Sequence, residues 1–137
     1  MIYPMFAMVV LTAVVLVTLF RSRVAAVRQG LVPVSYFGIY QGALEPEFTA
    51  KPARHFANLF ETPVLFYVVC LAAMITNNAG PVMQGLAWIY VVARVVHAYV
   101  HLGSNRIRNR LRVYFFSCLV LLAMWINVVV EVSMSRA

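Results

Sequence analysis

Four long apolar segments constrain the fold of this chain more than any other feature of its sequence. They extend over approximately residues 2–20, 54–76, 82–102 and 113–132, and together they make up most of the 137 residues. A helix rises 1.5 Å per residue, so about 20 apolar residues cross the roughly 30 Å hydrocarbon core of a membrane. Little chain remains for a domain outside the membrane. Any chemistry must therefore lie on the helices or on their connections.

The composition excludes an ordinary soluble surface. Hydrophobic residues make up 64% of the chain and charged residues only 11%, and the mean hydropathy is +0.86. In water-soluble domains about a quarter of the residues are charged. We therefore predict an all-α integral membrane protein in which residues 1–137 form one domain, an antiparallel four-helix transmembrane bundle.

Positive charges gather on one side of the predicted spans. Five Lys or Arg residues lie between or next to the first and second spans and four between the third and fourth, whereas the opposite side carries only Arg136. By the positive-inside rule, both basic connections face the cytoplasm and both termini face outward. Membrane topology thus accounts for the net charge of +7 without a nucleic-acid partner, because no basic soluble domain carries the arginines.

Polar side chains form a stripe on each of the later spans. At ~100° per residue, Arg54, Asn58 and Glu61 fall within about 60° of one another on the second helix. The stripes of the third and fourth helices consist of Tyr90, Arg94, His97, His101 and Asn105, and of Arg110 and Tyr114. Because charges in the hydrocarbon are costly, we expect all three stripes to face the bundle interior or a water-filled cavity.

Two interpretations of these stripes are open. In the structural one, Glu61 neutralises Arg54 or Arg94, and the amide and imidazole groups complete hydrogen bonds between helices. In the functional one, the arginines that a single carboxylate cannot balance bind an anionic ligand with carboxylates, a thiolate or phosphates. The surplus of positive charge favours the functional interpretation.

The histidines also raise the question of a metal, since His97 and His101 lie one helical turn apart. A metal site needs three or four protein ligands, however, and neither Cys70 nor Cys118 lies on a polar stripe. Glu61 is the only acid expected nearby, and the arginines would repel a divalent cation. We therefore predict no metal. A Ser-His-Asp hydrolase is excluded because the chain contains no Asp.

In their order along the chain, these motifs resemble the MAPEG family, the membrane-associated proteins in eicosanoid and glutathione metabolism. The matching residues are Arg54-x-x-x-Asn58-x-x-Glu61 followed by Pro63, Arg94-x-x-His97-x-x-x-His101, and Arg110-x-x-x-Tyr114. The resemblance extends from Arg21 to the fourth span. It implies a homotrimer in a bacterial inner membrane, with both termini periplasmic and glutathione bound as a co-substrate between subunits near the cytoplasmic side.

The resemblance also implies roles for individual residues. Arg21 matches the arginine at the end of the first helix that contacts glutathione, and the second-helix residues match those that hold its backbone and amino group. Arg110 matches the arginine that stabilises the thiolate, in keeping with the lower pKa of a thiol beside a cation. The expected binding residues are Arg21, Arg54, Asn58, Glu61, Arg94, His97 and Tyr114.

Several positions depart from the family pattern. His101 stands where the eicosanoid enzymes have a tyrosine near the thiol, and Leu111 stands where prostaglandin synthase has a serine. Phe56 and Ala57 stand where that synthase has histidine and arginine. His101 can still donate a hydrogen bond or act as a base. Arg110 and His101 are therefore the candidate catalytic residues.

From these residues we expect a glutathione-dependent transferase or peroxidase that acts on lipophilic electrophiles within the membrane. Its partners would be further copies of itself, membrane lipids and a lipophilic small-molecule substrate. The alternative is a non-catalytic membrane protein that binds an anionic metabolite or a lipid headgroup in the same cationic cleft.

Overall fold

The computed structural model describes residues 1–42 and 45–135, and it is helical throughout its regular elements. The elements are α1 (Ile2–Arg28), α2 (Tyr36–Ile39), α3 (Glu47–Asn58), α4 (Thr62–Ile75), α5 (Pro81–Leu102) and α6 (Ile107–Met134). Four spans are long and apolar enough to cross a membrane: α1, α3 together with α4, α5, and α6. The prediction of an all-α, four-helix integral membrane protein is confirmed.

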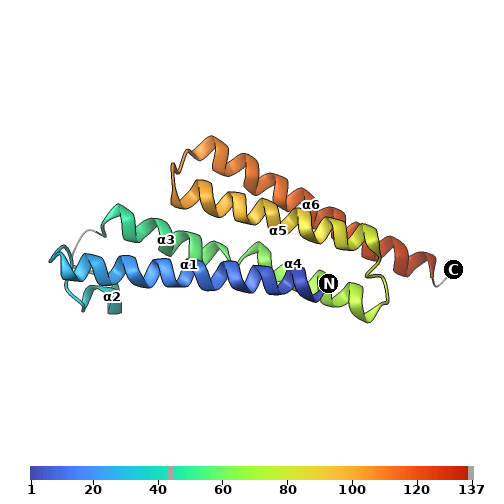
Figure 1. Ribbon diagram of the computed structural model, residues 1–137, viewed down its shortest axis with the longest axis horizontal. Coiled ribbons are helices and arrows are strands. Elements are labelled where there is room, and N and C mark those ends of the chain that lie inside the picture. Colours follow the sequence, from blue (N-terminus) through green and yellow to red (C-terminus); the bar gives the residue numbers. More distant parts are fainter. Residues whose placement is uncertain (43–44, 136–137) are drawn as a thin grey trace.

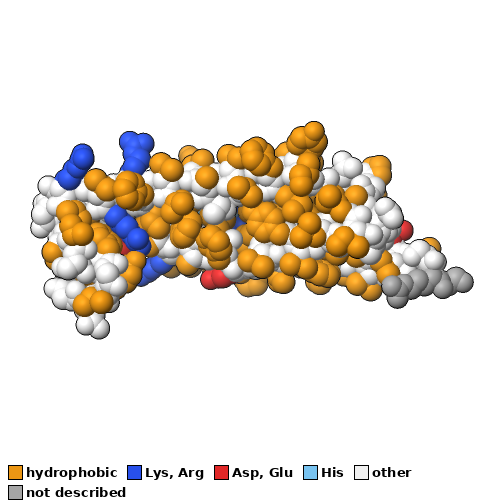
Figure 2. Space-filling model, turned by 90° about the horizontal axis from the view of Figure 1, so that it is seen from below, with side chains coloured by type: hydrophobic (Ala, Val, Ile, Leu, Met, Phe, Trp, Pro, Cys, Tyr) orange, Lys and Arg blue, Asp and Glu red, His pale blue; other side chains and the backbone are white. Residues whose placement is uncertain are grey.

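Consecutive spans run in opposite directions. Figure 1 shows α1 beside α3 and α4 in one layer, with the α5–α6 pair running alongside them at a small inclination. Both termini lie at the end that carries the α4–α5 turn. At the other end, α1 and α5 finish and α3 and α6 begin, and we call this the basic end because Lys and Arg side chains gather there (Figure 2). Arg136, which the charge count placed at the opposite end, lies outside the described residues.

The second span is broken in the middle. It begins at Glu47, earlier than the expected position near residue 54, and α3 ends at Asn58 before α4 starts at Thr62. Pro63 explains the break, because a proline at the start of α4 lacks the N–H that a continuous helix would use. Glu61 lies in this break, with φ −92° and ψ −103°. It is therefore not placed by the helical spacing assumed from the sequence.

The apolar core fills the interior of the four spans. Phe66 of α4 stacks on Tyr90 of α5, with ring centroids 4.5 Å apart and planes inclined by 11°. The fully buried Met8, Val15 and Met124 bring α1 and α6 into the same core. Many other apolar side chains point outward and cover the surface between the two ends (Figure 2), as expected for helices surrounded by lipid.

The short helix α2 packs back onto the last turns of α1. Tyr36 forms a small apolar cluster with Ala26 and Val32. Arg23 donates from Nη2 to the Tyr40 hydroxyl at 2.5 Å, and its guanidinium carbon lies 5.2 Å from the centroid of the Phe37 ring. The connection between the first two predicted spans thus contains α2 and the first half of α3.

Candidate ligand-binding site

A polar cavity of about 290 Å³ lies in the half of the bundle toward the basic end. It is formed where α3 and the break after it face α5 and the start of α6. Its lining consists of Arg54, Asn58, Glu61, His97, His101, Arg110, Leu111 and Tyr114. The polar stripes deduced from the sequence therefore meet at one place, and of the expected site residues only Arg21 and Arg94 are not in the lining itself.

Arg94 lies just behind the cavity and is fully buried. Its Nη2 donates to Asn58 Oδ1 at 2.6 Å and approaches the Asn58 backbone oxygen at 3.4 Å. The side-chain nitrogen of Asn58 in turn donates to Glu61 Oε2 at 2.8 Å. Because α3 ends at Asn58, its carbonyl lacks a full helical partner and can accept from Arg94. The broken helix thus supplies the hydrogen-bond acceptors for a buried cation.

This arrangement differs from the direct neutralisation considered in the structural interpretation. Glu61 is connected to Arg94 only through the side-chain amide of Asn58. The ion pair found within 4.0 Å in the described part of the chain joins Lys51 to Glu47, at 2.9 Å, and does not involve Glu61. Two further nitrogens of Arg94, Nε and Nη1, have no hydrogen-bond partner among the described residues. The positive charge near the cavity is therefore only partly compensated by the protein.

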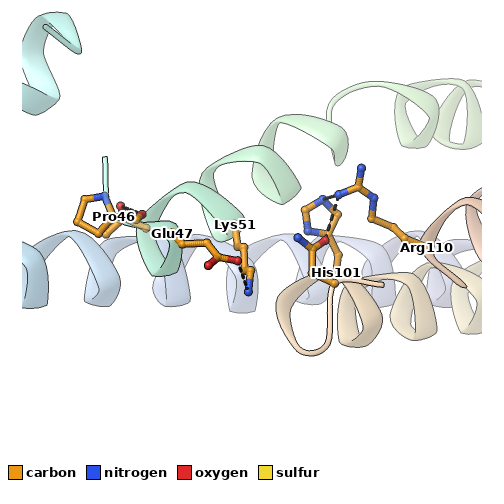
Figure 3. Close-up of polar contacts among 7 residues, drawn as sticks. Pro46, Glu47, Lys51, His101 and Arg110 are labelled. Atoms are coloured by element: carbon orange, nitrogen blue, oxygen red, sulfur yellow. Dashed lines mark hydrogen bonds and ion pairs between the residues drawn. The ribbon is translucent and has the colours of Figure 1, made fainter. Parts of the chain in front are cut away.

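Arg110 is held at the cavity by the end of α5. Its Nη1 donates to Asn105 Oδ1 at 3.1 Å and lies 3.4 Å from His101 Nε2 (Figure 3). A guanidinium can only donate, so in this contact His101 Nε2 is the acceptor. Asn105 occupies the turn between α5 and α6 with a φ of +47°, a conformation that asparagine tolerates better than most residues. The turn thereby sets the direction of the Arg110 side chain.

His55 is a functional candidate that the sequence analysis missed. Its ring is fully buried, with its centroid 5.0 Å from that of His101 and 5.4 Å from that of His97. Neither ring nitrogen of His55 has a hydrogen-bond partner in the described structure. A helical wheel places His55 ~100° away from Arg54 and so outside the stripe. The sequence signal that could have identified His55 as a candidate was its position next to Arg54, in the polar first half of the span.

The three histidines do not make a metal centre. The His97 and His101 rings meet edge-on, with an interplanar angle of 88°. Among the described residues, no three His, Cys, Asp or Glu side chains are arranged to hold a metal ion. The histidine cluster instead forms a polar wall with unused hydrogen-bonding capacity, beside Arg94 and Arg110.

Arg21 lies apart from the polar cavity. It lines a separate surface hollow of about 360 Å³ on α1, together with residues such as Phe20 and Arg28. The departures from the family pattern also have definite places: Leu111 lines the cavity, while Phe56 packs against Phe60 with ring centroids 5.0 Å apart. Within a single chain, the site therefore lacks the contribution expected from the first helix.

Comparison with known proteins gives a clear family assignment. Neither the curated proteins nor the solved structures include a match to this chain. The model of the MAPEG family, however, matches residues 1–130 of the 137-residue chain, which includes every residue of the polar cavity. The chain therefore belongs to the MAPEG family, a family of membrane proteins whose members work with glutathione.

Proposed function

We propose that this protein binds glutathione in the polar cavity and uses it to conjugate or reduce a lipophilic electrophile. The observation that carries the proposal is the charge of the site, where Arg54 and Arg110 line the cavity and Arg94 lies behind it, with Glu61 as the one carboxylate of the lining. Glutathione has two carboxylates, one amino group and a thiol. Its charges thus complement a cluster of arginines with one acid beside it.

The residues divide naturally between holding the peptide and activating its sulfur. Arg54 and Asn58 are suited to the carboxylate and amide groups, and the exposed Glu61 is suited to the ammonium group. Arg110 would lie beside the sulfur, where a cation favours the thiolate by 1.36 kcal/mol for each unit by which it lowers the thiol pKa. While Nε2 of His101 accepts from Arg110, the neutral ring can only donate a hydrogen bond toward the sulfur, and it would have to release Arg110 to accept the thiol proton.

The site in a single chain is incomplete, which supports a homotrimer with sites at the subunit boundaries. Arg54 and Glu61 are exposed, and Arg21 faces a different part of the surface. A neighbouring copy could cover the first two with its own Arg21. Native mass spectrometry from a mild detergent should give the mass of three chains, and a purely monomeric mass would argue against this assembly.

We further propose a bacterial inner-membrane location with the polar cavity toward the cytoplasm and both termini periplasmic. The basic end carries Lys51 and the described arginines near the span ends, as the positive-inside rule requires of a cytoplasmic face. Water-soluble glutathione would then enter from the cytoplasm, and the lipophilic substrate would enter from the membrane.

Titration of the detergent-purified protein with glutathione tests the proposed function. We expect saturable heat release together with ultraviolet thiolate absorbance. S-methylglutathione is the matched control, because it keeps the charged groups but has no thiol, and so it should bind without the absorbance. If glutathione neither binds nor gives a thiolate signal at any pH, the proposed function is wrong.

A non-catalytic role remains the second candidate. Leu111 places an apolar side chain in the cavity lining where the resemblance predicts a serine, which favours binding of an anion without activation of a thiol. Binding of both glutathione and its S-methyl analogue with equal affinity and no thiolate absorbance would support this role.

A further inference from the structure

A second concavity lies on the outer face of α5 and α6, and we call it the outer groove. It encloses about 520 Å³, and its walls are apolar side chains that include Trp88, Val92, Val96 and Phe116. Arg112 contributes a charge to this lining. The groove is the largest of the concavities described for this chain, and the proposed glutathione chemistry does not use it.

The outer groove and the polar cavity are lined by different residues of α5 and α6 and open on different sides of the pair. At ~100° per residue, Arg112 and Phe116 lie roughly 200° and 240° around α6 from Arg110. On α5, Trp88 lies about 180° from His97 by the same arithmetic. No residue lines both concavities. An occupant of the groove would therefore face the lipid side of the bundle and would not touch Arg110.

The groove is charged at one end and apolar along the rest of its length. Val96 and Arg112 lie toward the basic end, whereas Trp88 is eight residues earlier on α5, a rise of roughly 12 Å. In the described part of the chain no acidic side chain lies within 4.0 Å of Arg112. The groove thus offers an unpaired cation followed by a hydrocarbon-like channel. This polarity fits an amphiphile with an anionic head.

We propose that the outer groove binds an anionic phospholipid, with the headgroup phosphate at Arg112 and an acyl chain along Phe116 and Trp88. A guanidinium forms charge-assisted, bidentate hydrogen bonds with a phosphate. An arginine near the membrane surface favours an anionic over a neutral lipid by about fivefold. An uncharged lipophile would fill the apolar walls equally well but would leave Arg112 unpaired. The charge therefore selects the phospholipid.

Tryptophan quenching tests this proposal directly. The chain contains two tryptophans, so Trp125→Phe leaves Trp88 in the groove as the only indole. The full chain would be reconstituted in phosphatidylcholine vesicles with a small fraction of one lipid carrying brominated acyl chains, which quench on contact. Brominated phosphatidylglycerol should reach half-maximal quenching at about one-fifth of the mole fraction that brominated phosphatidylcholine requires.

The matched variants assign the preference to Arg112. Arg112→Gln should abolish the preference for phosphatidylglycerol, whereas Arg112→Lys should retain most of it. Arg28→Gln removes an exposed positive charge at the basic end of α1 and should leave the preference unchanged. The Trp125→Phe variant should unfold in detergent at the same temperature as the parent chain. Native mass spectrometry of the parent chain counts bound phosphatidylglycerol without any substitution.

Several outcomes would overturn the proposal. Equal quenching by the two phospholipids would mean ordinary lipid contact, and equal quenching by brominated diacylglycerol would mean a groove for uncharged lipophiles. A preference that survives Arg112→Gln would place the headgroup elsewhere. Absence of quenching by every lipid would mean that another copy of the chain covers the groove.

Discussion

Arg94 shows how one side chain links the break in the second span to the candidate site. It is fully buried, and its hydrogen bonds within the described structure go to Asn58, at the last position of α3. A buried cation without partners is strongly destabilising, so the acceptors at Asn58 are needed for folding as well as for any ligand. The same amide orients Glu61. Structural and binding roles are therefore combined in Asn58.

Replacing Asn58 should destabilise the protein. Asn58→Ala removes the 2.6 Å hydrogen bond from Arg94, and an unsatisfied buried group of this kind costs about 1–3 kcal/mol. Thermal unfolding in detergent should show a lower midpoint. Asn109→Ala, at an exposed position on α6, is the control and should change the unfolding free energy by less than about 0.5 kcal/mol. Equal midpoints for the two variants would contradict this role of Asn58.

Replacing Arg110 should impair chemistry more than binding. If Arg110 stabilises the thiolate, Arg110→Ala should lower kcat by roughly 10² to 10³, as when one preorganised donor is removed from a developing charge. The Kd for glutathione should rise less, because Arg54 and Glu61 still hold the peptide. Turnover with a model electrophile and calorimetric binding measure the two effects. Arg108→Ala, at an exposed position on α6 two residues before Arg110, should behave like the parent chain, and a similar loss there would indicate a general charge effect.

At the scale of the elements, the sequence predicts the spans well and the details of the second span poorly. Apolar periodicity suffices for four membrane-crossing helices, because nothing else in the chain can satisfy a backbone within lipid. A helical wheel assumes an unbroken helix, however, and so it could not place Glu61 after the break at residues 59–61. It also says nothing of neighbouring helices, and so it left out His55, which α5 covers.

The break itself should matter for binding. Pro63→Ala restores the missing backbone N–H and permits α3 and α4 to continue as one helix, which would replace the non-helical backbone at Glu61 and redirect its side chain. We expect greater helicity by circular dichroism and about tenfold weaker glutathione binding, the loss expected for one hydrogen bond to a charged group. Pro81→Ala, at the first position of α5, is the control. Increased helicity with unchanged affinity would show that the break does not position Glu61 for the ligand.

At the scale of the whole molecule, polarity is divided along the long axis. The polar cavity, α2 and the start of α3 lie toward the basic end, and the apolar core extends toward the termini. This division follows from the order of the spans, because the first and third connections lie at the basic end and the α4–α5 turn lies at the other end. It explains why residues from distant parts of the sequence meet in one site.

The proposed orientation can be tested by cysteine labelling in intact cells. Asn78→Cys, in the α4–α5 turn, should react with a thiol reagent that cannot cross the inner membrane, whereas Ser104→Cys, in the α5–α6 turn, should react only after lysis. The parent chain is the control, since its Cys70 is buried and its Cys118 is half-buried within α6. Labelling of Ser104→Cys alone in intact cells would reverse the orientation.

The broken second span also bears on how the protein enters the membrane during synthesis. The 14 residues of α4 rise about 21 Å, short of the roughly 30 Å hydrocarbon core. The α3 residues that complete the span include the charged Lys51 and Arg54. A translocon that releases each helix into the lipid according to its own hydrophobicity would release this segment inefficiently. Because α3 lies along α1, the first span is the natural partner for its release. In cell-free translation with microsomes, residues 45–80 alone should therefore integrate less efficiently than residues 1–80, and equal integration would show that the broken helix inserts unaided.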